Sequence, residues 1–510
     1  MRSRWPSRGR RVSGGTRHIL LLTLVGLLVW LPGIASLLVI DRDEARYAQA
    51  TVQMVETGDL IDIRFQDEPR YKKPVGAYWA QALAIGATGQ WDDVRAGARP
   101  IWAQRLPSVA GAWVAVLFTY LAGAALLGRR AALLGAAMLG LSVSLVFEAH
   151  QAKTDAMLCG AAAAVLYGWA ARRAWPFWLG LAAGVLLKGP VIVGVAALAM
   201  GSWWGLGKLR SRSPGVAPGS QEEGPRREAL QARGPGSSPG QGVWRPFPIL
   251  MALTFTLPWF VAIHFVSDGA FYVEALGRDF GAKLGSAQET HGGPPGYYLL
   301  TALVMFFPGV IAVPLAVRWA WRERAEPAVR LLLCWLVPMW LVLELVPTKL
   351  PHYTLPLYPA LALLAGGAVA AWRPELPKWS RLYAGVAVVT IAGFFGALAP
   401  RAGILDTSRE LMRRVEKGER VVSPDFREPS LVYLAGTETR LDLAEVEVGD
   451  VLVLTSPAPE CGANVDRVSG LNYVKGDRLE LHVISTDACG ARELETWRAR
   501  EVARRGGGGK

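Results

Sequence analysis

The sequence predicts an all-α polytopic membrane protein, and three observations lead to this fold class. First, 52% of the 510 residues are hydrophobic and 19% are charged, whereas soluble domains carry about 25% charged residues. Second, the apolar residues form long blocks, which rules out a mostly disordered chain and argues against a single soluble globule. Third, the basic residues, which give a formal charge of +13, lie between these blocks. This is the positive-inside pattern of membrane proteins and not the signature of a nucleic-acid-binding protein.

The first apolar block covers residues 19–40 and contains no formal charge. A helix of this length crosses a hydrocarbon core of about 30 Å. Residues 1–18 form a basic N-terminus, with six arginines and no acid within 2–17. A signal peptide would share the basic leader, but the block is long for one and no small-residue cleavage site follows it. We therefore predict an uncleaved first helix with a cytoplasmic N-terminus.

Ten further apolar blocks bring the predicted number of spans to 11, within a range of 11 to 13 helices because the blocks around Lys188 are short. They cover residues 106–128, 131–147, 156–171, 175–187, 189–207, 247–266, 296–317, 329–346, 354–371 and 382–399. An alternating path places five basic segments on the side of the N-terminus: 129–130, 172–173, 208–245, 318–330 and 373–381. The other side receives the large loop 41–105 and the shorter segments 148–155, 188, 267–295 and 347–353.

The chain outside the spans divides into two parts with different compositions. Residues 208–245 are rich in Gly, Pro, Ser, Arg and Gln, which predicts a disordered cytoplasmic loop between spans of a 19–400 transmembrane domain. Residues 401–510 contain short β-type runs at 419–424, 430–436, 450–457 and 478–486 and a helical stretch at 407–417. We expect a small extracytoplasmic α/β soluble domain there.

The four cysteines fall into two pairs. Cys159 and Cys334 lie in apolar blocks and are expected to be ordinary buried residues. Cys461 and Cys489 both lie in the exported part of the chain, where a disulfide could persist, and two free buried thiols are the alternative. No C-x-x-C spacing indicates a metal site.

The large loop opens with three acids, Asp41, Asp43 and Glu44. Asp41 and Glu44 have the spacing of a helix capping box, and Gly58 could end that helix, whose apolar stripe would let it lie on the bilayer. This structural interpretation leaves Asp43 without a role. A carboxylate at the mouth of a helix bundle can act as a general base or orient a hydroxyl, so both interpretations stay open.

The same loop resembles the first periplasmic loop of the bacterial lipid A aminoarabinose transferases, whose wider relatives are the protein O-mannosyltransferases of the GT-C fold. The shared pattern is Asp-Glu after the first span, Arg-Tyr-Ala, a Gly-Asp turn, and Lys-Pro before Tyr-Trp. It is matched in order by Asp43-Glu44, Arg46-Tyr47-Ala48, Gly58-Asp59, Lys73-Pro74 and Tyr78-Trp79. A match of order and spacing over about forty residues is far more specific than an acidic pair.

Later segments extend the resemblance over about residues 18–400. The segment HQAKTDAMLCG places Asp155 at the family's second acidic site, and LLKGPV, with Lys188, matches a recurring turn. The segment after the span at 247–266 resembles the family's long outer loop and contains Glu274, Arg278 and His291. PTKLPHYTLPLYPAL resembles a Ser-Lys-Leu-Pro-x-Tyr segment that contains Lys349 and Tyr353.

The resemblance implies a GT-C glycosyltransferase that moves a sugar from a polyprenyl-phosphate donor to an extracytoplasmic acceptor. Cations must balance the charge on the departing phosphate, and a hydroxyl acceptor needs a carboxylate nearby. The predicted donor phosphate-binding residues are Lys73, Arg278, Lys349 and Tyr353. The predicted catalytic residues are Asp43, Glu44 and Asp155. Acceptors of this class are a lipid A-like lipid, an envelope glycan or a protein hydroxyl.

One departure from the family pattern concerns metal binding. Lys72-Lys73-Pro74 stands where relatives that bind lipid A often have Glu-Lys-Pro. The missing acid helps to hold a metal in some relatives, so we predict no metal site here and no firm cofactor beyond the sugar donor. The departure also speaks against lipid A as the acceptor.

Simpler roles exist for several of these residues. Lys73, Lys188 and Lys349 could extend toward lipid headgroups, and Glu344 could pair with Lys349 as structural support. His150, His264 and His291 lack metal-ligand spacing and suit hydrogen-bonded helix ends.

Two other classes of protein compete with the enzyme. A secondary transporter would need paired repeats and ionisable residues near the membrane midplane, whereas the charges here gather at the ends of the blocks. A non-catalytic membrane scaffold would leave the Asp-Glu, Lys-Pro and Lys-Leu-Pro segments without a reason.

Overall fold

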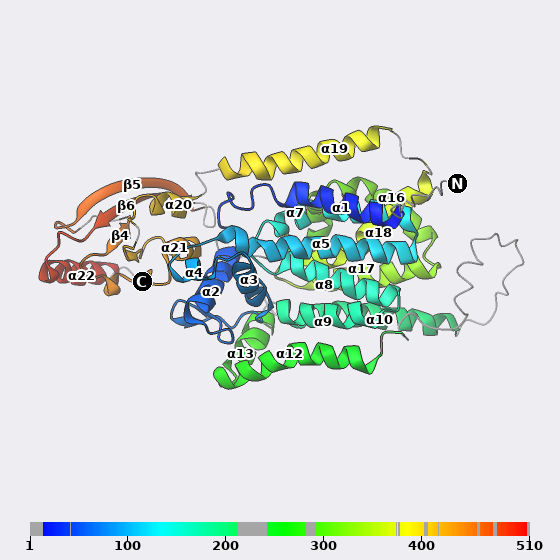
Figure 1. Cartoon of the computed structure of the whole chain (residues 1–510), viewed down its shortest axis with the longest axis horizontal. Helices are drawn as coiled ribbons and strands as arrows, with labels where there is room; N and C mark the ends of the chain where they lie inside the picture. The colour runs from blue at the N-terminus through cyan, green and yellow to red at the C-terminus, as the bar shows by residue number, and fades with distance from the viewer. Residues whose placement is uncertain are drawn as a thin grey trace, which may run out of the picture.

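The computed structural model describes residues 14–40, 42–211, 242–281, 292–373, 375, 378–401, 406–416, 418–455, 459–472 and 477–506. These residues form an elongated bundle of helices with a small sheet at one end (Figure 1). Helices α1 (Gly14–Trp30) and α19 (Lys378–Gly393) run along one side of the bundle, and α12 (Pro246–Val266) runs along the opposite side. The predicted disordered loop 208–245 lies largely outside the described residues.

Each of the eleven predicted apolar blocks contains at least one helix. The remaining helices of the bundle are α5 (Ile101–Leu126), α6 (Arg129–Gly140), α7 (Val143–Ala149), α8 (Asp155–Ala170), α9 (Ala174–Lys188), α10 (Val191–Ser211), α15 (Tyr297–Met305), α16 (Val313–Arg322), α17 (Pro327–Leu345) and α18 (Tyr358–Trp372). Among the described residues, six helices are long and apolar enough to cross a membrane, or up to eight if each of two bent pairs is one span. The mostly helical membrane fold is confirmed, and the count of 11 to 13 spans stays a prediction.

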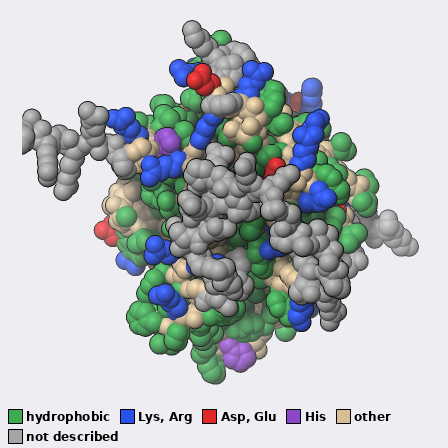
Figure 2. All heavy atoms as spheres, turned by 90° about the vertical axis from the view of Figure 1, so that its right-hand side faces the viewer, with side chains coloured by type: hydrophobic (Ala, Val, Ile, Leu, Met, Phe, Trp, Pro, Cys, Tyr) green, Lys and Arg blue, Asp and Glu red, His purple; other side chains and the backbone are tan. Residues whose placement is uncertain are grey.

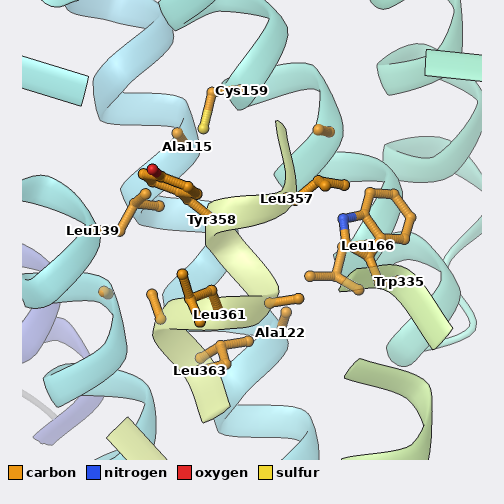
Figure 3. Close-up of a cluster of buried hydrophobic side chains, with 14 of the residues drawn as sticks. Ala115, Ala122, Leu139, Cys159, Leu166, Trp335, Leu357, Tyr358, Leu361 and Leu363 are labelled. Atoms are coloured by element: carbon orange, nitrogen blue, oxygen red, sulfur yellow. The ribbon is translucent and has the colours of Figure 1, made fainter. Parts of the chain in front are cut away.

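The centre of the bundle is α18, which packs against α5, α6, α8 and α17. Figure 3 shows Tyr358, Leu361 and Leu363 of α18 among side chains of these helices. Gly366 and Gly135 bring α18 close to α6: a Cβ on Gly366 would lie 2.5 Å from the carbonyl oxygen of Ala131, and a Cβ on Gly135 would lie 2.7 Å from that of Ala362. Small residues let membrane helices approach and gain dispersion contacts where no hydrophobic driving force acts between them.

The first apolar block is only partly helical. The prediction of one helix over 19–40 is wrong beyond Trp30, where α1 ends. Pro32 lacks a backbone N–H, and Gly33 adopts a φ of 85°, which only glycine takes without strain. Residues 31–40 therefore leave the helix as turns, and their carbonyl groups become available to other partners.

Two other blocks bend sharply. The block 131–147 divides into α6 and α7, which meet at 58°. Ser142 begins α7, and its hydroxyl accepts the N–H of Leu145. The block 296–317 bends by 118° between α15 and the segment Gly309–Arg322. These bends place helix ends inside the bundle, where polar groups can gather.

The first large loop contains α2 (Asp43–Thr57), a hairpin of β1 (Arg64–Phe65) and β2 (Glu68–Pro69), α3 (Gly76–Ala87) and α4 (Trp91–Arg95). The predicted helix end at Gly58 is confirmed, since Gly58 has a φ of 77° and its N–H bonds to the carbonyl of Met54. The helix starts after Arg42, and Asp41 lies outside the described residues. The apolar stripe of Ala45, Val52 and Val55 is fully buried against protein, so this face does not lie on the bilayer.

Residues 406–506, which we call the C-terminal region, form a sheet with strand order β3-β4-β6-β5. Strand β3 (Val421–Val422) runs parallel to β4 (Val451–Leu454), and β6 (Asp477–Ser485) is antiparallel to both β4 and β5 (Ala463–Asn472). Helices α20 (Thr407–Met412), α21 (Pro429–Ala435) and α22 (Ala491–Gly506) accompany the sheet. The strand predicted at 430–436 is wrong: Pro429 occupies the first turn of α21, where proline favours helix initiation.

The C-terminal region packs on the first large loop through α21 (Figure 1). Tyr433 is fully buried in the cluster formed by α2, α3 and α5, and its hydroxyl donates to Gln104 Oε1 at 2.7 Å. The carbonyl oxygen of Tyr433 accepts from Arg99 at 3.0 Å. Thr437 donates to Glu56 at 2.7 Å. The C-terminal region is therefore packed and hydrogen-bonded against the first large loop.

The cysteine alternatives are resolved. Cys461 and Cys489 form a disulfide between residues 28 positions apart, whereas Cys159 and Cys334 are free and buried. The disulfide joins the start of β5 to the segment that follows β6. It constrains one edge of the C-terminal sheet.

Replacing both Cys461 and Cys489 by Ser is expected to destabilise the C-terminal region by about 3 kcal/mol, because an open chain loses the loop-closure constraint. Hydrogen exchange measured on peptides from β5 and β6 should become faster, while peptides from α18 should not change. Reducing agent on the unmodified protein is the matched control and should reproduce the effect. Unchanged exchange in β5 and β6 would contradict a stabilising role for the bridge.

Candidate active site

An apolar cavity and a polar cavity meet at the end of the bundle that carries the first large loop. The apolar cavity has a volume of about 610 Å³ and lies among α9, α10, α12 and α17, with Val195 and Met339 on its walls. The polar cavity has a volume of about 480 Å³ and is lined by the start of α2 and the loops that face it. The residues that line both cavities are Lys72, Lys73, Asp155, Lys188, Thr348, His352 and Tyr353.

Asp43 is the first residue of α2, and its side chain is accessible from the polar cavity. Protein surrounds the carboxylate on its other sides, and this burial alone would raise its pKa. The neighbouring basic groups of Lys153, His352 and Arg70 outweigh the burial and hold the pKa of Asp43 below its usual value. The carboxylate is therefore ionised at neutral pH and can accept a proton or orient a hydroxyl.

Asp155, the second predicted acid, is the first residue of α8 and lies where the two cavities meet. Its carboxylate binds Lys188, the last residue of α9. Lys153 Nζ lies 3.9 Å from Asp155 Oδ2, and His352 Nε2 lies 3.8 Å from the same oxygen. Lys188 thus points to a buried carboxylate and not to a lipid headgroup.

Glu148 completes this group of buried charges. Lys153 Nζ lies 2.9 Å from Glu148 Oε2, and His352 Nδ1 lies 3.7 Å from Glu148 Oε1. Burial would lower the pKa of Lys153, but the negative charges of Glu148 and Asp155 raise it above its usual value. Lys153 is consequently a permanent positive charge on the wall that faces Asp43.

Three of the four predicted phosphate-binding residues line the polar cavity: Lys73, Arg278 and Tyr353. Arg278 belongs to η1 (Val273–Gly281), its side chain is 78% exposed, and Glu274 lies 3.4 Å from it. Tyr353 belongs to η3 (Pro351–Leu357), and Lys188 Nζ lies 5.1 Å from the centre of its ring. These groups come from three separate segments of the chain.

Two predicted residues are buried, and their charged groups are bound by other parts of the protein. Lys349 is 4% exposed, and its Nζ donates to the carbonyl of Val346 at 2.6 Å. Glu44 is fully buried and forms an ion pair with Arg105. Glu344, the suggested partner of Lys349, accepts instead the N–H groups of Gly296 and Tyr298. His291 lies outside the described residues.

The polar cavity carries an excess of positive charge. Eight cationic side chains line it: Arg42, Arg46, Arg70, Lys72, Lys73, Lys153, Lys188 and Arg278. Four acidic side chains line it: Asp43, Glu44, Asp155 and Glu274. The difference of four charges suits an anionic ligand.

Arg70, Lys153 and His352 were not among the predicted site residues. Lys153 lies two residues before Asp155, and His352 lies one residue before Tyr353. Their position in segments already singled out was the available signal. No sequence signal indicated Arg70, because its position in the lining of the polar cavity depends on the β1–β2 hairpin that precedes it.

Within the described part of the chain, no group of three or more His, Cys, Asp or Glu side chains is arranged to hold a metal ion. The prediction that the loop lacks a metal site is not tested by this arrangement.

Two solved structures share the fold of this chain. The chain superimposes on ArnT from Cupriavidus metallidurans bound to undecaprenyl phosphate with a TM-score of 0.68 and 17% identity, covering 92% of this chain and 98% of that one. It also superimposes on the oligosaccharyltransferase of Archaeoglobus fulgidus in its apo form, with a TM-score of 0.52, 10% identity and coverages of 84% and 64%. Structural similarity at such low sequence identities establishes the fold alone.

Sequence comparison identifies a narrower set of relatives. The chain is 28% identical over 371 residues to the undecaprenyl phosphate-alpha-4-amino-4-deoxy-L-arabinose arabinosyl transferase of Erwinia tasmaniensis, covering 68% of this chain and 59% of that protein. The enzyme of the same name from Pseudomonas paraeruginosa is 27% identical over 352 residues, with coverages of 64% and 55%. The chain thus spans less than two thirds of the length of these curated relatives. No family model matches it, and the predicted resemblance to the aminoarabinose transferases is confirmed.

Replacing Lys188 by Met is expected to lower the free energy of unfolding by roughly 3 kcal/mol, because it leaves the buried carboxylate of Asp155 without its closest cation. Thermal unfolding in detergent measures the loss. The double variant Lys188→Met with Asp155→Asn should recover most of the stability, since no charge is then left unpaired. If the two single variants and the double variant show additive losses, the ion pair does not couple α8 to α9.

Proposed function

We propose that the protein is an integral membrane glycosyltransferase that takes its sugar from a polyprenyl-phosphate donor. The observation that carries this proposal is the shared border of the two cavities. A polyprenyl phosphate has a long hydrocarbon chain and an anionic head, which correspond to the apolar cavity of about 610 Å³ and the cation-rich polar cavity. A water-soluble donor would have no use for the apolar cavity.

The donor phosphate is assigned to Lys73, Arg278 and Tyr353. Lys73 and Tyr353 line both cavities, so a phosphate at their junction keeps its lipid chain on the apolar side. Arg278 lies on an exposed turn of the polar cavity and can form two parallel hydrogen bonds to phosphate oxygens. Lys349, whose Nζ is turned to a backbone carbonyl, is assigned a supporting role in the 346–353 segment.

The chemical step is assigned to Asp43. The acceptor hydroxyl oxygen forms a bond to the anomeric carbon of the sugar while the bond from that carbon to the phosphate oxygen breaks. The hydroxyl proton passes to the Asp43 carboxylate, and the polyprenyl phosphate leaves with the bonding electron pair. A single displacement of this kind inverts the anomeric carbon. Asp155, held by Lys188 at the junction, is the second carboxylate beside the reacting centre.

The names of the relatives say more about the sugar donor than about the acceptor. The names of the curated relatives specify undecaprenyl phosphate and 4-amino-4-deoxy-L-arabinose, and we propose the polyprenyl-phosphate part of that chemistry for this chain. The acceptor is proposed as an extracytoplasmic lipid, glycan or protein hydroxyl. The sugar is left to experiment because no described contact selects one.

The proposed topology places both cavities and the C-terminal region outside the cytoplasm of a bacterial inner membrane. Figure 2 looks onto the opposite end of the bundle, where Lys and Arg side chains outnumber acids, as the positive-inside rule requires of a cytoplasmic face. The disulfide between Cys461 and Cys489 supports an oxidising surrounding for the other end. We propose residues 1–18 as the cytoplasmic N-terminus, 19–400 as the catalytic domain with 11 to 13 spans, and 401–510 as the soluble domain.

Replacing Asp43 by Asn should abolish sugar transfer, because the amide cannot accept the hydroxyl proton. Mass spectrometry of envelope lipids, glycans and proteins from cells that lack the chain, or carry the wild type or the variant, provides the measurement. A sugar that disappears with the gene and returns only with the wild type would identify the acceptor. Full restoration by a correctly inserted Asn variant would remove Asp43 from the mechanism, and no missing sugar would favour a transporter.

Replacing Lys73 by Ala should weaken binding of a polyprenyl phosphate by about tenfold to a hundredfold, as expected when one charge-assisted bond to a phosphate is lost. Binding of the purified protein to undecaprenyl phosphate in detergent gives the comparison. Lys208, which packs over Trp204 at the other end of α10, provides the matched control, and Lys208→Ala should bind normally. Equal affinities of the Lys73 variant and the wild type would reject the phosphate assignment.

A further inference from the structure

Arg105 uses all of its hydrogen-bond donors on two neighbouring parts of the chain, the turn after α1 and the first large loop. It extends from α5 and is 1% exposed. Its Nε and Nη2 donate to the two carboxylate oxygens of Glu44 at 2.8 and 3.0 Å. Its Nη groups also donate to the backbone carbonyls of three residues in the turn after α1, namely Ile34, Leu37 and Leu38, at 2.9 to 3.2 Å.

The Glu44 carboxylate likewise accepts several hydrogen bonds. Besides the fork of Arg105, its carboxylate accepts the backbone N–H of Ile40 at 2.9 Å and that of Ala152 at 2.8 Å. One buried ion pair therefore joins three chain segments: the turn that follows α1, the first turn of α2, and the segment that connects α7 to α8. Each of these segments is a loop or a helix end without a regular backbone ladder of its own.

The residues next to these contacts belong to the proposed active site. Asp43 immediately precedes Glu44, and Lys153 immediately follows Ala152. Lys153 is the cation that acts most strongly on the Asp43 carboxylate. The ion pair thus sets the distance between the proposed catalytic acid and its principal counter-charge, although Arg105 does not line the polar cavity and the Glu44 carboxylate is bound by Arg105.

The backbone before Asp43 also needs external support. Arg42 has a φ of 70°, in the left-handed region that costs a non-glycine residue roughly 1 to 3 kcal/mol. The side chain of Arg42, which occupies the N-cap position of α2, makes no capping hydrogen bond. The N–H of Ile40 donates to the Glu44 carboxylate and so connects the chain across Arg42, and Arg105 donates to the carbonyl of Leu38 before it. The strained start of the helix is therefore maintained by the same pair.

Stability alone does not explain a charged pair at this position, because apolar side chains of similar volume are often as stabilising as a buried ion pair. We propose that Arg105 and Glu44 are positioning residues that hold Asp43 toward Lys153 in the polar cavity. This inference rests on the proposed function of Asp43. It assigns the buried glutamate of the Asp-Glu segment a role distinct from that of the aspartate.

The test is Arg105→Lys, which keeps the positive charge beside Glu44 but cannot form the fork or reach three carbonyls. When Asp43 moves away from Lys153, its depressed pKa rises, so activity that requires the ionised carboxylate is lost at a higher pH. We expect the acidic limb of the pH–rate profile to shift upward and kcat to fall about tenfold to a hundredfold. The donor KM should change little, because Lys73, Arg278 and Tyr353 lie on other segments.

Two further variants complete the test. Glu44→Asp retains the charge and shortens the side chain by one methylene, and it should shift the profile in the same direction. This variant provides the test if Arg105→Lys proves too unstable to purify. Arg99→Lys is the matched control, since Arg99 pairs with Glu56 at 3.0 Å near the other end of α2. It should leave the profile unchanged.

The outcomes separate the inference from the proposed function. An unchanged kcat and acidic limb in Arg105→Lys and Glu44→Asp would overturn the inference, even if thermal stability fell. If the wild type transfers no sugar, the proposed function fails, and hydrogen exchange of peptides around Ile40 and Ala152 becomes the deciding measurement. Faster exchange in the variants would retain the geometric part of the inference, and unchanged exchange would overturn it.

Discussion

The ion pair between Asp155 and Lys188 joins the first residue of α8 to the last residue of α9, and both cavities border on it. A charge buried among apolar helices is costly unless a partner of opposite sign lies close to it. Lys153 and His352 add further contacts to the same carboxylate. Because these charges are balanced locally, the polar cavity can lie directly beside the apolar cavity without leaving an unpaired charge between them.

The bundle and its loops divide the structural tasks. Apolar helices packed around α18 provide a fixed frame, whereas the proposed site residues lie at helix ends, in short helical turns or on loops: Asp43, Lys73, Asp155, Arg278 and Tyr353. Loops carry chemistry well when a rigid scaffold holds their ends. The bends between α6 and α7 and around α15 fit this arrangement, since each bend leaves a helix end inside the bundle.

Much of this arrangement could be predicted from local sequence. The apolar blocks located the helices, and the Asp-Glu, Lys-Pro and Lys-Leu-Pro segments located the walls of the site. Partners distant in the chain could not be predicted, such as the pairing of Glu44 with Arg105, which lies 61 positions away. The orientation of Lys349 depends on side-chain torsions that no local pattern encodes. The helix α21 replaced a predicted strand because Pro429 and burial against α2 outweighed its β-prone composition.

The burial of Tyr433 has a consequence for how the protein is made. Its hydroxyl meets Gln104, a residue synthesised 329 positions earlier. A chain is built from its N-terminus, so the loop that carries Asp43 leaves the ribosome long before the side chain that covers it. During this interval the apolar side of α2 lacks part of its cover. The loop therefore cannot reach its final packing until residue 433 has been translated and has reached the loop, which makes completion of the site depend on the C-terminal region.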